Sequence, residues 1–145
     1  MGLLQIEGIT HWSIPVNNLD DSEKFYGDLL GLKGLGRLGN SRMSCFNVDN
    51  QNILLCERGE NIDKSFTEDP NVHYSFTVTA ETLARACKVF TEKNVPVEKL
   101  YYRKKGYFPG RELYFTDPSG NRLELRDPTW QDGMPEPSFE EVAAG

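Results

Sequence analysis

The sequence predicts an α+β fold built from two β-α-β-β-β modules that follow one another along the chain. Strand-like and helix-like segments follow in the same order in both halves, and each half has one helix-like segment with a single apolar stripe. The two histidines of the chain, His11 and His73, lie near the start of two similar strand-like runs, residues 9–16 and 72–78. An internal duplication accounts for all of these observations.

The two modules are expected over about residues 8–58 and 71–127. Alternating apolar residues predict strands, and apolar residues three or four apart predict helices. In the first module the expected elements are a strand (about 8–16), a helix (about 20–30) and strands at 33–38, 42–48 and 52–57. In the second module they are a strand (about 71–78), a helix (about 80–93) and strands at 97–103, 111–116 and 122–126.

Both helices have recognisable ends. Asp20 and Glu23 are spaced as in a capping box, and Gly31 is placed to end the first helix. Thr79 can cap the second helix, and Pro96 blocks its continuation. These signals support one helix in each module.

The segments outside the modules differ in composition. Residues 58–70 are polar and rich in turn-forming residues, as expected of a linker between two copies. Residues 128–145 form an acidic tail that contains prolines, and we expect it to be extended or frayed, with Trp130 and Phe139 as candidate anchors on the domain or on a neighbouring subunit. A single domain over residues 1–127 followed by this tail is the predicted organisation.

Composition excludes several classes of protein. The chain has 145 residues, enough to bury a core without disulfides, and its three cysteines form no CxxC motif. The first residues show no leader-peptide pattern, so we expect a reduced, cytoplasmic protein. Apolar runs are too short to span a membrane, and a net charge of -6 argues against nucleic acid as a partner.

Two imidazoles and one carboxylate are expected at equivalent strand positions. Alternation places His11 on the same strand face as Ser13, and His73 on the same face as Ser75. In the last strand, Glu124 lies on the face opposite its leucine neighbours. Two histidines and a carboxylate are the ligand set of an iron site, and they equally suit manganese, nickel or zinc. The separations match no local metal motif, so this hypothesis depends on the duplicated fold bringing the strands together.

Four segments carry a resemblance to a known family: residues 10–18 (THWSIPVNN), 25–32 (FYGDLLGL), 72–76 (VHYSF) and 113–125 (LYFTDPSGNRLEL). In this combination the chain resembles the vicinal oxygen chelate superfamily, which includes glyoxalase I, extradiol dioxygenases, fosfomycin-resistance transferases and bleomycin-resistance proteins. The resemblance implies paired modules that form a curved mixed sheet around a cavity. It also implies a divalent metal ion (Fe, Mn, Ni or Zn) held by His11, His73 and Glu124, and a homodimer whose sites draw ligands from one chain or from two.

The resemblance also indicates residues around the metal. Tyr114 is a candidate catalytic residue that donates a hydrogen bond to a metal-bound oxygen, with Ser13 in a supporting role. Glyoxalase I has a further carboxylate on the fourth strand of the first module, where this chain has Leu54 and Cys56, so the fourth protein ligand is expected to be missing. The basic residues around the loop at 104–110 suggest an anionic substrate. That loop is unlike the Ser/Gly-rich potassium-binding loop of fosfomycin-resistance transferases that use potassium.

These observations predict a divalent-metal-dependent enzyme of the glyoxalase/dioxygenase type, acting on a small substrate whose vicinal oxygens bind the metal. Lyase, dioxygenase and transferase chemistry all stay open. One alternative is a metal-dependent thiol transferase of the fosfomycin-resistance type. The other is a metal-free protein of the bleomycin-resistance type that binds a drug in the same cavity.

Overall fold

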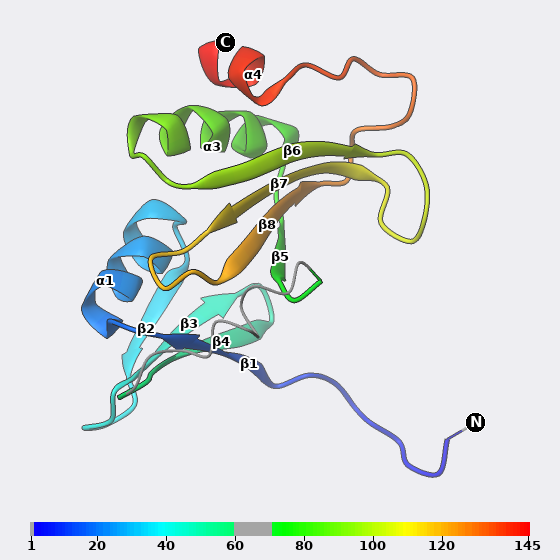
Figure 1. The fold of residues 1–145 in the computed structure, drawn as a ribbon. Coiled ribbons are helices and arrows are strands. Elements are labelled where there is room, and N and C mark those ends of the chain that lie inside the picture. Colours follow the sequence, from blue (N-terminus) through cyan, green and yellow to red (C-terminus); the bar gives the residue numbers. More distant parts are fainter. Residues whose placement is uncertain (1, 60–70) are drawn as a thin grey trace. The chain divides into compact units, whose positions relative to one another are not determined.

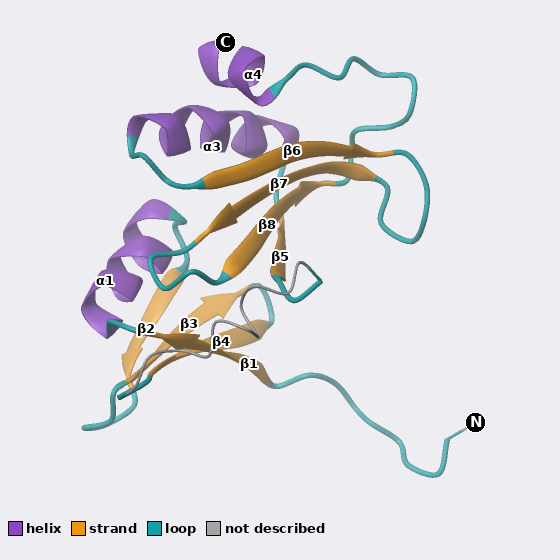
Figure 2. Cartoon of the chain, viewed as in Figure 1, coloured by secondary structure: helices purple, strands orange, loops and turns teal. Residues whose placement is uncertain are grey.

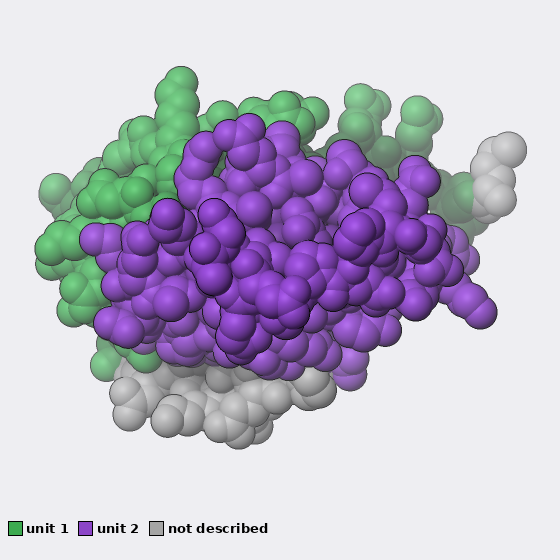
Figure 3. Space-filling model, turned by 90° about the horizontal axis from the view of Figure 1, so that it is seen from above, with its two compact units in different colours: residues 1–62 green, residues 63–145 purple. Residues whose placement is uncertain are grey.

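The computed structural model describes residues 2–59 and 71–145 (Figure 1). The chain divides into two compact units, Met1–Ile62 and Asp63–Gly145 (Figure 3). Each unit contains one of the predicted modules; that both modules form a single domain stays a prediction. Most of the expected linker, residues 60–70, lies outside the described residues.

The first unit is a four-stranded mixed sheet with one helical segment (Figure 2). The strand order is β1-β4-β3-β2, in which β1 runs parallel to β4 and the other pairs are antiparallel. Its elements are β1 (His11–Val16), α1 (Leu19–Glu23), the π-helical segment η1 (Lys24–Leu29), β2 (Lys33–Arg37), β3 (Met43–Val48) and β4 (Gln51–Glu57).

The second unit repeats this arrangement. Its strand order is β5-β8-β7-β6, again with the first strand parallel to the last and the other pairs antiparallel. Its elements are β5 (Tyr74–Thr77), α3 (Ala80–Glu92), β6 (Val97–Arg103), β7 (Gly110–Thr116), β8 (Arg122–Asp127) and α4 (Phe139–Ala144). The identical topology of the two sheets confirms the predicted α+β fold of two β-α-β-β-β modules.

The first helix begins one residue earlier than predicted, and its cap is different. The side chain of Asn18 accepts a hydrogen bond from the backbone N–H of Asp21 (2.9 Å), so the predicted capping box of Asp20 and Glu23 is wrong. The Glu23 side chain instead accepts hydrogen bonds from strands β2 and β3. Gly31 ends the helix with φ of +78°, as expected of a residue without a Cβ atom.

In the second unit, one face of the sheet packs against α3. The helix begins at its predicted cap, because the Thr79 hydroxyl accepts the N–H of Thr82 (3.1 Å). Its buried side chains include Leu83 and Phe90, and the ring centroids of Phe90 and Phe115 lie 4.6 Å apart. The apolar residues of β7 and β8 thus face the helix, and alternation turns their polar neighbours to the opposite face.

The tail is folded onto the second unit. Trp130 is only 5% exposed, its ring centroid lies 5.0 Å from that of Tyr102, and its indole N–H donates to the carbonyl oxygen of Pro135 (2.9 Å). The predicted anchor is therefore confirmed for Trp130. The extended conformation is wrong over Phe139–Ala144, where Ser138 caps the helix α4 and α4 contacts α3.

None of the helices in the described part of the chain has both the length and the apolar character needed to cross a membrane.

Candidate metal and substrate site

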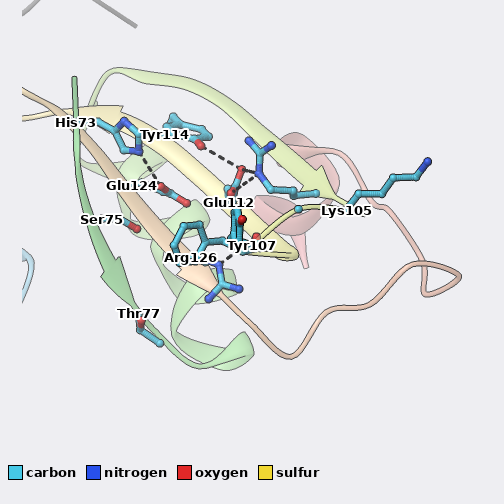
Figure 4. Close-up of a pocket in the computed structure, with 12 residues that line it drawn as sticks. His73, Ser75, Thr77, Lys105, Tyr107, Glu112, Tyr114, Glu124 and Arg126 are labelled. Carbon is cyan, nitrogen blue, oxygen red and sulfur yellow. Dashed lines mark hydrogen bonds and ion pairs between the residues drawn. The ribbon is translucent and has the colours of Figure 1, made fainter. Parts of the chain in front are cut away.

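A cavity of about 560 Å³ lies on the polar face of the second unit's sheet. Its walls come from strands β5 to β8 and from the loop between β6 and β7, and Figure 4 shows the side chains that point into it. This volume is within the range of sites that bind small molecules. The cavity therefore has the size and the polar lining of a small-molecule site.

His73 and Glu124 meet in this cavity. The imidazole Nε2 of His73 lies 3.1 Å from the carboxylate Oε1 of Glu124. Strand register explains the meeting, because Ser75 pairs with Glu124 across the parallel ladder and His73 lies two residues before Ser75. The other ring nitrogen, Nδ1, lies 3.2 Å from the carbonyl oxygen of Asn71.

Glu124 is buried in a setting that disfavours its charge. The residue is 4% exposed, and burial raises the pKa of its carboxyl above the usual range, with the neighbouring carboxylate of Glu112 acting in the same direction. A hydrogen bond from Ser75 and the charge of His73 oppose this increase of the pKa. A cation next to Glu124 would relieve the cost of its buried negative charge.

A second buried carboxylate, Glu112, lies in the same cavity. The Nε of Arg103 donates to both carboxylate oxygens, at 3.0 and 2.8 Å, and the hydroxyl of Tyr114 donates to Oε1 (3.0 Å). Glu112 is 2% exposed, and its hydrogen bond raises the pKa of Arg103. Three polar groups from β6 and β7 are thereby held in one network (Figure 4).

Tyr114 is a neighbour of both carboxylates. It pairs with Glu124 across the β7–β8 ladder, and its ring makes an edge contact with the imidazole of His73 (5.7 Å between centroids). Burial, and then the charges of Glu124 and Glu112, raise the pKa of its hydroxyl to about 12. The phenol is therefore protonated and acts as a hydrogen-bond donor, and its proton is directed at Glu112. Its predicted role toward a metal-bound oxygen stays a prediction.

The mouth of the cavity carries basic and aromatic side chains. The guanidinium of Arg126 donates to the backbone carbonyl oxygens of Phe108 and Pro109 and so holds the loop that forms one wall. Tyr107, in the same loop, is 95% exposed. Figure 4 shows the side chain of Lys105 extending away from the His73 and Glu124 pair.

The predicted residues of the first module belong to the other compact unit. His11 and Ser13 are exposed on β1, where they pair with Asn52 and Leu54 of β4. His11 and Leu54 therefore share a sheet face, and the carboxylate of Glu57 instead accepts the N–H of Leu19 (2.7 Å) on the other face. Within the described residues, no group of three His, Cys, Asp or Glu side chains lies close enough to hold a metal ion.

Sequence reasoning missed the role of Glu112. Alternation places it on the strand face of Tyr114, but nothing in the local sequence pairs it with Arg103. That pairing depends on the β6–β7 register, in which Tyr101 is opposite Glu112 and Arg103 lies two residues further along. The signal available was a carboxylate two residues before a candidate site residue.

Comparison with known proteins identifies the family. The family model of the glyoxalase/bleomycin resistance protein/dioxygenase superfamily matches residues 8–125. The chain therefore belongs to this superfamily, as its four sequence segments predicted.

Two relatives of known sequence are both metallothiol transferases named FosB. Metallothiol transferase FosB of Staphylococcus haemolyticus is 28% identical over 129 residues, which cover 89% of this chain and 89% of that protein. Metallothiol transferase FosB of Lysinibacillus sphaericus is 28% identical over 139 residues, which cover 90% of this chain and 89% of that protein.

Solved structures share the fold. A glyoxalase/dioxygenase from Nostoc punctiforme has a TM-score of 0.70 at 20% identity, covering 88% of this chain and 94% of that one. The fosfomycin resistance protein FosX from Listeria monocytogenes has a TM-score of 0.68 at 18% identity, covering 84% of this chain and 92% of that one.

Proposed function

We propose that this protein is a divalent-metal-dependent enzyme that acts on a small substrate with adjacent oxygen atoms. In this proposal His73 and Glu124 provide two of the metal ligands, and His11 of the first unit provides the third. The observation that carries the proposal is the 3.1 Å approach of the His73 imidazole and the Glu124 carboxylate inside a cavity large enough for a substrate.

The donor groups of the second unit fit a divalent ion. The contact of His73 Nδ1 with the Asn71 carbonyl oxygen fixes the ring and, with the proton on Nδ1, leaves Nε2 free to act as a ligand. Glu124 is buried beside this nitrogen with a raised pKa, a setting that a cation would stabilise in its charged form. A divalent ion at this point supplies Lewis acidity toward the oxygens of a substrate.

The surrounding residues of the chain bind and orient the substrate in this proposal. The cavity of about 560 Å³ is large enough to hold a small molecule. Tyr114, on the strand next to Glu124, keeps its proton and donates a hydrogen bond to Glu112, so its hydroxyl oxygen can accept a hydrogen bond from a substrate. Ser13 stays a candidate for a supporting role beside His11.

The proposed third ligand, His11, can come from the same chain or from a second copy of the chain. His11 is exposed on β1, an edge strand of its own sheet, and can serve as a ligand in its own chain or in a second copy. We therefore propose a homodimer, as the family resemblance implies. Mixing His11→Ala protein with His73→Ala protein tests this, because sites shared between chains regain part of their metal binding in the mixture.

Metal analysis tests the proposal as a whole. Protein supplied in turn with Fe, Mn, Ni and Zn is expected to retain about one ion per chain of at least one metal. His73→Ala and Glu124→Gln are expected to lose it, because each removes one of the few protein ligands. Glu81→Gln is the matched control, since Glu81 is exposed on α3 and lies outside the cavity. Metal retention that is equal in Glu124→Gln and Glu81→Gln contradicts the proposal.

A second candidate is a metallothiol transferase of the fosfomycin-resistance type. The relatives at 28% identity over 89% of both chains favour it. In that reaction the sulfur of a thiol bonds to an epoxide carbon, the carbon–oxygen bond breaks, and the released oxygen takes up a proton. Incubation of metal-loaded protein with fosfomycin and cysteine or glutathione distinguishes it, because a thiol adduct forms only if the chain has this activity. Substrate binding that survives complete removal of metal would instead favour a metal-free binding protein.

A further inference from the structure

Glu112 occupies the part of the cavity next to the proposed metal ligands. We propose that Glu112 determines substrate specificity by excluding small dianions, such as phosphonates, from the inner end of the cavity, where His73, Glu112 and Glu124 lie. This end instead takes a neutral group that donates a hydrogen bond, such as a hydroxyl. The inference rests on the proposed function only in taking this cavity as the substrate site.

The first argument is that Arg103 and Tyr114 already donate hydrogen bonds to Glu112. Arg103 directs its Nε at both oxygens of Glu112, at 3.0 and 2.8 Å, and Tyr114 directs its hydroxyl at one of them. The Glu112 side chain is 3% exposed and that of Arg103 is 40% exposed, so the acid lies deeper than the base. An anion that bound to the Nε of Arg103 and the hydroxyl of Tyr114 would have to displace a buried carboxylate from these partners, which is costly.

The second argument is charge. Glu112 and Glu124 are both buried carboxylates, 2% and 4% exposed, and both line this cavity. A dianion at the inner end would meet this pair of carboxylates in a region that water screens poorly. Of the other lysine and arginine residues that line the cavity, Arg126 donates to loop carbonyl oxygens and Lys105 extends away from the His73 and Glu124 pair (Figure 4).

The third argument is what the inner end offers instead. Two carboxylates and a histidine nitrogen present mainly hydrogen-bond acceptors toward the cavity. A hydroxyl group of a substrate can donate to these acceptors without bringing a second negative charge. The inner end is therefore complementary to a neutral polar group.

Titration with methylphosphonate tests the inference, with binding followed by calorimetry on chelator-treated protein. Wild-type protein is expected to bind it weakly, and Glu112→Gln is expected to bind it about tenfold or more tightly, because a charged donor becomes available to the anion. Glutamine keeps the shape of the side chain, and Glu112→Ser gives a second measure. Glu81→Gln changes the net charge equally on an exposed helix and is expected to bind as the wild type does.

Two results would overturn the inference. One is wild-type binding of methylphosphonate as tight as that of Glu112→Gln. Should the Glu112 variants not fold, tight binding by the wild type overturns the inference on its own. The other is a gain in Glu112→Gln that persists when Arg103→Gln is added, since the released anion site must then lie elsewhere. Because these titrations are made without metal, their failure is distinct from a failure of the metal-binding proposal.

Discussion

The two tryptophans of the chain provide a matched test of how the tail is held. Trp130 is 5% exposed, packs against Tyr102 with tilted rings and donates to the Pro135 carbonyl oxygen, whereas Trp12 is 49% exposed on β1. Replacing a buried large aromatic residue by alanine costs about 3–5 kcal/mol, because the transfer of its surface and its packing contacts are lost. Trp130→Ala is therefore expected to destabilise the second unit by this amount.

The destabilisation expected for Trp130→Ala has two parts, one from lost packing and one from a lost hydrogen bond. Trp130→Phe keeps an aromatic ring against Tyr102 but loses the indole N–H. We expect it to lower the free energy of unfolding by about 1 kcal/mol for the hydrogen bond, together with a smaller loss from packing. Trp12→Ala is expected to cost roughly 1–2 kcal/mol, since about half of this side chain is exposed to solvent.

Urea unfolding followed by circular dichroism measures these differences in the free energy of unfolding. Tryptophan fluorescence adds a direct readout, because the emission of Trp130 in a Trp12→Phe background is expected at shorter wavelength than that of Trp12 in a Trp130→Phe background. The reasoning is refuted if Trp130→Ala and Trp12→Ala cost the same, for the tail would then be extended rather than packed.

Three further predictions concern other parts of the fold. Hydrogen bonds from Arg42 and the backbone lower the pKa of Glu57 to about 2. The charged Glu57 therefore stabilises the fold above its ordinary pKa of 4.5, and this stabilisation is lost as pH falls from 4.5 toward 2. Carboxyl NMR of Arg42→Gln should show a pKa of Glu57 closer to 4.5. Burial raises the pKa of Cys87 to about 11, so mass spectrometry after alkylation near neutral pH should find Cys56 modified well before Cys87; equal rates would contradict this. Gly110→Ala should destabilise the protein by about 1–3 kcal/mol in thermal unfolding, because φ is +149° and an added Cβ would lie 2.6 Å from a β8 carbonyl oxygen; an unchanged Tm would contradict it.

The sequence was sufficient to predict the strands and the strand faces on which His73 and Glu124 lie. Alternation and the duplicated order of elements predicted the faces of β5 and β8, and parallel pairing of these strands then brings His73 and Glu124 together. Both residues are specified by a repeated local pattern, and a pattern of this kind is visible without knowledge of the register of distant strands.

Other features depend on tertiary contacts. Asn18 and Asp20 both lie near the start of the first helix, and Asn18 caps it where Glu57 also accepts the N–H of Leu19. The network of Arg103 and Glu112 follows from the register of a hairpin whose loop length does not specify the pairing. The six-residue α4 is too short to be stable alone and forms against α3, so its own sequence carries only the weak signal of Ser138 followed by Glu141.

An anomalous-scattering map of crystals grown with manganese or zinc tests the proposed metal site most directly. We predict one peak at about 2.0–2.2 Å from His73 Nε2 and from a carboxylate oxygen of Glu124, with His11 of the same chain or of a second copy as the third protein ligand. A map with no peak at the His73 and Glu124 pair, from crystals of protein that retains metal, would contradict the proposal.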